Sequence, residues 1–152
     1  MFDNTEKFYM IATDGKYKVL ATFCLAEGDS ESATFNPDEV LKKAVLSSAK
    51  YVLFSHNHLS NGVKPSVNDI ITTKSLVKKL ASGGVMVLDH IIINNQEYLS
   101  FNENGLMSLM YSTVDDNDIG NLLNKINLPI SQGGTKLDDD LALFLFQTAN
   151  SL

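Results

Sequence analysis

One stretch of this sequence carries most of the information about its fold and its chemistry: residues 55–69, which read SHNHLSNGVKPSVND. The apolar and aromatic run before it, residues 51–54, predicts a buried strand. Side chains at positions i and i+2 of a strand point to the same face, so His56 and His58 would face one side together. With the carboxylate of Asp69, they make a three-ligand set suited to a catalytic zinc ion, which leaves the fourth position for water.

The second half of this stretch also has the features of a helix start. Ser66 follows Pro65 and precedes a segment with a helical pattern, which makes it a natural N-cap. Asp69 then lies at N3, where a carboxylate suits both the free backbone N–H groups and the helix dipole. Helix capping alone explains these two residues. Their combination with the His-x-His pair favours a metal site.

These residues resemble the pattern of the JAB/MPN (JAMM) metalloprotease family, in particular its RadC-like branch. The family pattern is His-x-His-Pro followed by Ser and Asp at fixed spacing, and this sequence supplies four of its residues in register: His56, His58, Ser66 and Asp69. More of the RadC-like branch is present: Asn57, Ser60, Gly62 and Pro65 within the motif, residues 88–93 (LDHIII) and 98–101 (YLSF) after it, and Gly28 and Pro37 before it. The resemblance covers about residues 6–110.

The resemblance implies an α/β fold with a mixed central sheet flanked by helices, the JAB/MPN, cytidine-deaminase-like sandwich. It implies one zinc ion held by His56, His58 and Asp69, and hydrolysis of a peptide or isopeptide bond. The substrate or partner would be a protein or peptide. Ser66 would hydrogen-bond the oxyanion, and a carboxylate would take a proton from water.

The sequence departs from the family pattern at two positions that matter for catalysis. Leu59 replaces the proline after the second histidine. The family's general base is a glutamate on an earlier strand, and an ungapped comparison places that position at Phe23; Glu27, beside Gly28, is the candidate base in its place. The alternative function is therefore a catalytically impaired MPN-type module that binds other proteins. A role as a DNA-repair accessory protein rests on the family label alone.

The rest of the sequence predicts an alternating series of strands and helices. Asp14-Gly15 indicates a hairpin turn, and Asn36-Pro37 indicates a helix start. The predicted strands are residues 7–13, 17–26, 50–55, 85–93 and 97–101, and the predicted helices are residues 37–48 and 67–81. The order ββαβαββ is typical of an α/β protein with a mixed sheet. His90, in an apolar strand, is expected to be a buried structural histidine, and the alternative is a supporting role near the metal.

We expect one main domain, residues 1–112, and an acidic C-terminal extension, residues 113–152. The extension contains six Asp and two Lys, so it contributes −4 of the net charge of −6. It ends in a run with helical character, LDDDLALFLFQTANSL, which is too apolar to remain free in water. This final segment should pack on the domain, on a second copy of the chain, or on a partner protein.

Composition places the chain in the cytoplasm. The first residues, MFDNTEKFYM, carry acids and no apolar run, and no segment approaches the ~18–20 apolar residues of a membrane span. The single cysteine, Cys24, cannot form an internal disulfide, and its apolar surroundings in the sequence predict a core position.

Charge argues against a nucleic-acid partner. The net charge is −6, and all 12 basic residues are Lys, although Arg is the commonest side chain that contacts guanine edges. We predict that binding to duplex DNA at physiological salt is no tighter than the nonspecific range of ~10⁻⁴ to 10⁻⁶ M. Fluorescence anisotropy with a labelled duplex measures this, and a sequence-specific complex at nanomolar concentration would contradict the prediction.

Overall fold

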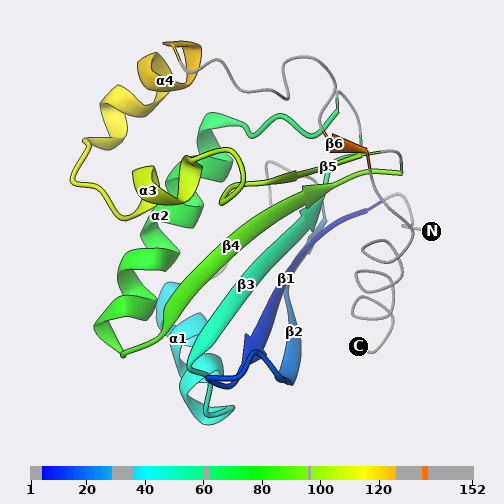
Figure 1. Ribbon diagram of the computed structural model, residues 1–152, viewed down its shortest axis with the longest axis vertical. Coiled ribbons are helices and arrows are strands. Elements are labelled where there is room, and N and C mark those ends of the chain that lie inside the picture. The colour runs from blue at the N-terminus through cyan, green and yellow to red at the C-terminus, as the bar shows by residue number, and fades with distance from the viewer. Residues whose placement is uncertain (1–4, 29–35, 60–61, 96, 126–134, 137–152) are drawn as a thin grey trace.

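The computed structural model describes residues 5–28, 36–59, 62–95, 97–125 and 135–136. These residues form a sheet with helices packed against it (Figure 1). The apolar run predicted to end the C-terminal extension lies outside the described residues.

The sheet is mixed, and its strand order is β2-β1-β3-β4-β5-β6. Neighbouring strands run antiparallel except for β3 and β4, which are parallel and are connected through a helix. The strands are β1 Glu6–Thr13, β2 Val19–Gly28, β3 Tyr51–Asn57, β4 Met86–Ile93, β5 Glu97–Ser100 and β6 Thr135–Lys136. The predicted mixed α/β sheet and the order of its first seven elements are confirmed.

Helices α1 (Pro37–Leu46) and α2 (Val67–Ser82) begin where capping chemistry predicts. The Asn36 side chain accepts a hydrogen bond from the backbone N–H of Asp38, and Pro37 occupies the first turn, where its missing N–H costs nothing. Helix α2 is the connection between the parallel strands β3 and β4. Two shorter helices, α3 (Leu106–Met110) and α4 (Asp116–Lys125), follow β5.

One core lies between the sheet and these helices. Phe8 and Met10 of β1 are buried on the helix-facing side, where they pair with His56 and Phe54 of β3. Buried residues from all four helices join the same cluster: Val40, Ala44, Ile70, Leu76, Leu80, Leu106, Met110, Ile119 and Leu123. Two of these, Ile119 and Leu123, belong to the predicted C-terminal extension, so its first helix packs on the main core.

The prediction that Cys24 is a core residue is wrong, because its side chain is exposed. Strand β2 lies at the edge of the sheet, and Cys24 pairs with Tyr9, whose side chain alternates with those of Phe8 and Met10. Cys24 therefore points away from the helix-facing core. Within the described residues, no helix is both long enough and apolar enough to cross a membrane.

Candidate metal centre

Strand β3 carries the two histidines to one side of the sheet. His56 lies in β3, and His58 extends the strand because its backbone N–H donates to the carbonyl oxygen of Ile93 in β4, at 2.9 Å. The two imidazole rings therefore lie side by side, with centroids 4.8 Å apart. The site forms at the carboxyl end of a strand in a βαβ unit, which is where open α/β sheets commonly bind ligands.

Helix α2 brings Asp69 to these rings. Its N-cap, Ser66, accepts a hydrogen bond through Oγ from the backbone N–H of Asp69, and the Asp69 carboxylate accepts one from the backbone N–H of Ser66 at 2.8 Å. This reciprocal pair is a capping box. The predicted helix start is thus present, and it orients the carboxylate of Asp69 toward the histidines.

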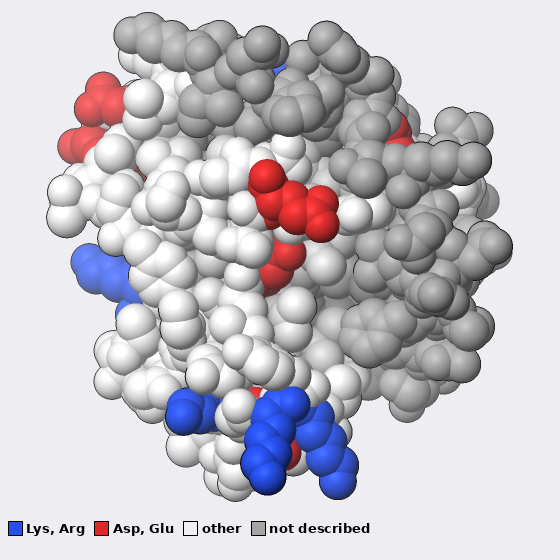
Figure 2. Space-filling model, in the orientation of Figure 1, with Lys and Arg blue, Asp and Glu red and all other residues white. Residues whose placement is uncertain are grey.

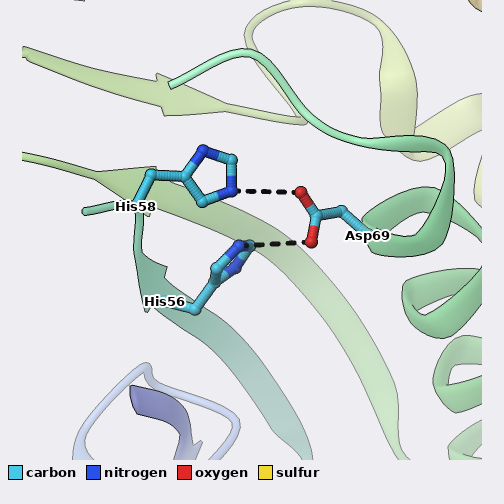
Figure 3. Close-up of side chains that lie close together, drawn as sticks. All are labelled: His56, His58 and Asp69. Carbon is cyan, nitrogen blue, oxygen red and sulfur yellow. Dashed lines mark hydrogen bonds and ion pairs between the residues drawn. The ribbon is translucent and has the colours of Figure 1, made fainter. Parts of the chain in front are cut away.

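The three side chains converge tightly (Figure 3). Asp69 Oδ2 lies 3.1 Å from His58 Nε2, and Asp69 Oδ1 lies 3.3 Å from His56 Nε2. One potential ligand atom from each residue lies within 4.8 Å of the other two, a separation that a metal ion could bridge. His56 Nε2 is buried and makes no hydrogen bond of acceptable geometry. It is an unsatisfied polar atom of the kind that requires an explanation.

The Nδ1 atoms of His58 and His56 each contact another group of the protein. His58 Nδ1 lies 3.1 Å from the carbonyl oxygen of Gly62, which can only accept, so Nδ1 carries the proton. Gly62 has φ of +74°, a conformation that favours glycine and turns this carbonyl toward the ring. His56 Nδ1 lies 2.6 Å from Nε2 of His90, which is completely buried as predicted.

Burial and charge act in opposite directions on the protonation of this cluster. Burial alone would raise the pKa of Asp69, but its contacts with His56 and His58 lower that pKa far below the ordinary value. Burial would lower the pKa of His58, but the contact with Asp69 outweighs it and raises the pKa. Burial lowers the pKa of His90 well below its usual value, which keeps that ring neutral. The cluster therefore combines an ionised Asp69 carboxylate with a His58 ring that binds a proton more readily than usual.

Of the two residues predicted to be catalytic, Ser66 lies beside the cluster and Glu27 does not. Ser66 is exposed beside Asp69, and because its Oγ accepts from Asp69 N–H, its own hydroxyl proton is free to be donated. Glu27 is exposed and pairs with Lys7, whereas the residue that faces His56 on β1 is Phe8. The strand register thus places Glu27 on the face of the sheet opposite to the cluster.

Another carboxylate, that of Glu6, lies on the same face as the cluster. Glu6 precedes Phe8 by two residues, and Phe8 stacks on His56 with ring centroids 5.5 Å apart. Continued by two residues in each strand, the antiparallel register places Glu6 opposite His58. The negative charge of Glu6 also helps to raise the pKa of His58, which indicates that the carboxylate lies near this ring.

Asn57 holds the start of β1 in this position. Its side chain accepts a hydrogen bond from the backbone N–H of Lys7 at 2.7 Å and donates one to the carbonyl oxygen of Thr5 at 3.0 Å. The prediction from sequence did not include Glu6. The sequence does place Glu6 two residues before Phe8 at the start of an alternating strand. That position indicates a site residue only once the pairing of β1 with β3 is known.

Comparisons with known proteins agree with this arrangement. The model of the RadC-like JAB domain family matches residues 1–106, which include all three members of the cluster. A UPF0758 protein of Fusobacterium nucleatum is 33% identical over 106 residues, 70% of this chain and 46% of that protein. A UPF0758 protein of Nitrosococcus oceani is 40% identical over 102 residues, 67% of this chain and 46% of that protein.

The chain thus spans about half the length of the curated relatives that it matches. The matched region contains β1 through β5 and helices α1 and α2, so it includes the whole βαβ unit that forms the site. With the family model covering more than half of the sequence, the chain belongs to the RadC-like JAB domain family.

Proposed function

We propose that this protein is a zinc-dependent hydrolase of peptide or isopeptide bonds, with the metal held by His56, His58 and Asp69. The observation that carries the proposal is the convergence of His56 Nε2, His58 Nε2 and the Asp69 carboxylate at the start of α2. Nitrogen and carboxylate ligands in a set of three, with one position left open, are typical of catalytic zinc.

The residues present fit a divalent cation on chemical grounds. His58 presents an unprotonated Nε2 when the ring is neutral, because its Nδ1 proton is given to the Gly62 carbonyl. His56 Nε2 is buried without a hydrogen bond and faces a carboxylate oxygen. A nitrogen lone pair that faces an ionised carboxylate is repelled by it unless a positive charge lies between them. A proton on the ring or a divalent cation can supply that charge, and a zinc ion would do so for both histidines at once.

The surrounding residues supply the remaining parts of a hydrolytic site. A zinc ion bound here would polarise the scissile carbonyl and lower the pKa of the attacking water. Glu6, on the same face of the sheet, accepts the proton from that water. The Ser66 hydroxyl donates to the carbonyl oxygen as negative charge develops, and the N-terminus of the 16-residue helix α2 favours the same charge.

The proposed substrate is a protein or peptide, and the proposed location is the cytoplasm, where the exposed thiol of Cys24 would remain reduced. In the face shown in Figure 2, most Lys side chains gather at the end of the molecule where α1 and the β1–β2 turn lie. That end is far from the carboxyl end of β3, so the Lys side chains gathered there, among the described residues of this face, do not form a basic surface beside the site.

A direct test uses the purified chain with one equivalent of zinc and two substrate sets, a mixed peptide library and lysine-linked isopeptides. We expect slow cleavage in at least one set, detected by mass spectrometry. Cleavage should stop with a chelator and resume when zinc is restored, because the bond-breaking step needs the ion. Zinc-loaded protein that cleaves no member of either set would contradict the hydrolase proposal while leaving metal binding intact.

A further inference from the structure

A continuous line of buried hydrogen bonds connects the start of α2 to the metal-facing histidine of β3. Thr73 Oγ1 donates to the carbonyl oxygen of Asp69 at 2.7 Å and lies 2.6 Å from His90 Nδ1. His90 Nε2 in turn lies 2.6 Å from His56 Nδ1. Thr73 and His90 are completely buried and His56 is 6% exposed, so water does not compete for these contacts.

The direction of each proton follows from the first bond. A carbonyl oxygen can only accept, so the single hydroxyl proton of Thr73 is committed to Asp69. The hydroxyl must then accept from His90, which places the His90 proton on Nδ1.

The same reasoning continues one ring further. Because His90 is neutral with its proton on Nδ1, its Nε2 is an acceptor. The short contact with His56 therefore requires a proton on His56 Nδ1. When His56 is neutral, its Nε2 must then be unprotonated, and this is the atom that lies 3.3 Å from the Asp69 carboxylate.

We propose that Thr73 and His90 are positioning residues that fix His56 in the Nδ1–H tautomer and so present its Nε2 lone pair to the cation site. The tautomer follows from the hydrogen bonds alone. Its consequence for metal affinity rests on the metal site proposed above. Hydrogen bonds from the outer nitrogen of a metal-binding histidine hold the ring in position and raise its basicity as a ligand.

The surroundings of His90 favour a fixed proton arrangement. Its ring packs against Phe8, Phe54 and Phe101, with centroids at 5.2, 6.3 and 4.6 Å. Apart from Thr73 and His56, these neighbours offer no strong hydrogen-bonding group to the ring. If the Thr73 hydroxyl donated to His90 instead, its oxygen and the carbonyl oxygen of Asp69 would face one another at 2.7 Å as two acceptors, which disfavours the reversed arrangement. Asp69 thus contacts the site in two ways. Its carboxylate contacts the His56 ring directly, and its backbone carbonyl orients that ring through Thr73 and His90.

The sharpest variant is Thr73→Val, which keeps the shape of the side chain and removes the hydroxyl. His90 Nδ1 then loses its acceptor, and the ring is free to move its proton to Nε2 and reverse the bond with His56. Thr73→Ser keeps the hydroxyl and serves as the rescue. Thr13→Val is the matched control, because Thr13 is also buried and bonds backbone carbonyls but lies at the far end of β1.

Two measurements test the proposal. Long-range ¹⁵N–¹H NMR of the metal-free protein at mildly alkaline pH should show the Nδ1–H tautomer of His56 in the wild type, in Thr73→Ser and in Thr13→Val. It should show a gain of the Nε2–H form in Thr73→Val. Competition with a chromophoric chelator should show a ~10- to 100-fold loss of zinc affinity in Thr73→Val alone, the usual scale for such supporting residues.

The outcomes separate the two claims. A wild type with His56 in the Nε2–H form, or a Thr73→Val variant with the zinc affinity of Thr73→Ser, would overturn the positioning role. The His56 tautomer could change in Thr73→Val as expected while the wild type binds no zinc. That result would support the hydrogen-bond assignment and refute the proposed metal site. Thermal unfolding of each variant verifies that it is folded before the comparison is made.

Discussion

Replacement of His58 by alanine is expected to abolish zinc binding. Elemental analysis of the wild type, purified without chelator and supplied with zinc, should give about one zinc per chain, since three protein ligands converge at one point. His58→Ala leaves one imidazole and one carboxylate, which do not hold zinc at ordinary free concentrations. Zinc affinity of the wild type should also fall as the pH is lowered through the raised pKa of His58, because protons then occupy Nε2.

Two further variants separate metal binding from folding. Leu59→Ala changes the exposed neighbour of His58 and should keep one zinc per chain. Asp69→Asn retains an oxygen that can accept from the backbone N–H of Ser66, so the helix cap should survive while the charged ligand is lost. We therefore expect its zinc affinity to collapse in a protein that remains folded, with a lower melting temperature because the contacts of the ionised carboxylate with His56 and His58 are also lost. If the wild type contains no zinc and takes up none when zinc is added, the proposed metal centre is refuted.

Local periodicity, together with the resemblance to the JAB/MPN pattern, was sufficient to predict that His56, His58 and Asp69 lie together. The i, i+2 spacing of His56 and His58 determines that they share a face, and a helix that begins at Ser66 returns Asp69 to them. Both relations depend only on nearby residues and on the hydrogen bonding of single elements. For the same reason, the capping and metal explanations of Asp69 could not be separated from sequence. The structure shows that the Asp69 carboxylate both accepts from the backbone N–H of Ser66 and contacts the His58 ring.

The face on which Glu27 lies depends on a bulge in β2, which the sequence pattern does not reveal. Phe23 and Glu27 are four residues apart and would share a face in an unbroken strand. The register of β1 and β2 shifts between Phe8/Tyr9, because Phe8 pairs with Ala26 and Tyr9 pairs with Cys24, which leaves one extra residue in β2. Phe23 therefore faces the core and Glu27 faces away.

Long-range register also concealed Glu6 and Thr73, and it left two roles open for His90. These residues lie on three different elements, β1, α2 and β4, and they meet the cluster only after the strands have paired. An apolar strand that contains one histidine predicts a buried ring, which is correct for His90, but it does not identify the partners of that ring. Contacts between elements distant in sequence are set by the packing of the whole core, and no local pattern records them.

Glu6→Gln is expected to keep one zinc per chain and to lower any hydrolytic rate by ~10²- to 10⁴-fold, the usual range for a general base. The amide keeps the shape of the side chain at its place opposite His58 but cannot take a proton. Glu27→Gln is the matched control, since it makes the same chemical change on the other face of the sheet and should leave the rate unchanged. The measurement is the cleavage rate of the best substrate at equal zinc occupancy.

The pair of variants also decides between the two functions that the sequence left open. Loss of activity in Glu27→Gln but not in Glu6→Gln would contradict the face assignment, because the strand register would then have to differ from the one observed. If the wild type and both variants bind zinc and none of them cleaves a substrate, the catalytically impaired interaction module is favoured. A rate that falls only in Glu6→Gln requires the carboxylate to lie on the metal side of β1, and that side is fixed by the stacking of Phe8 on His56.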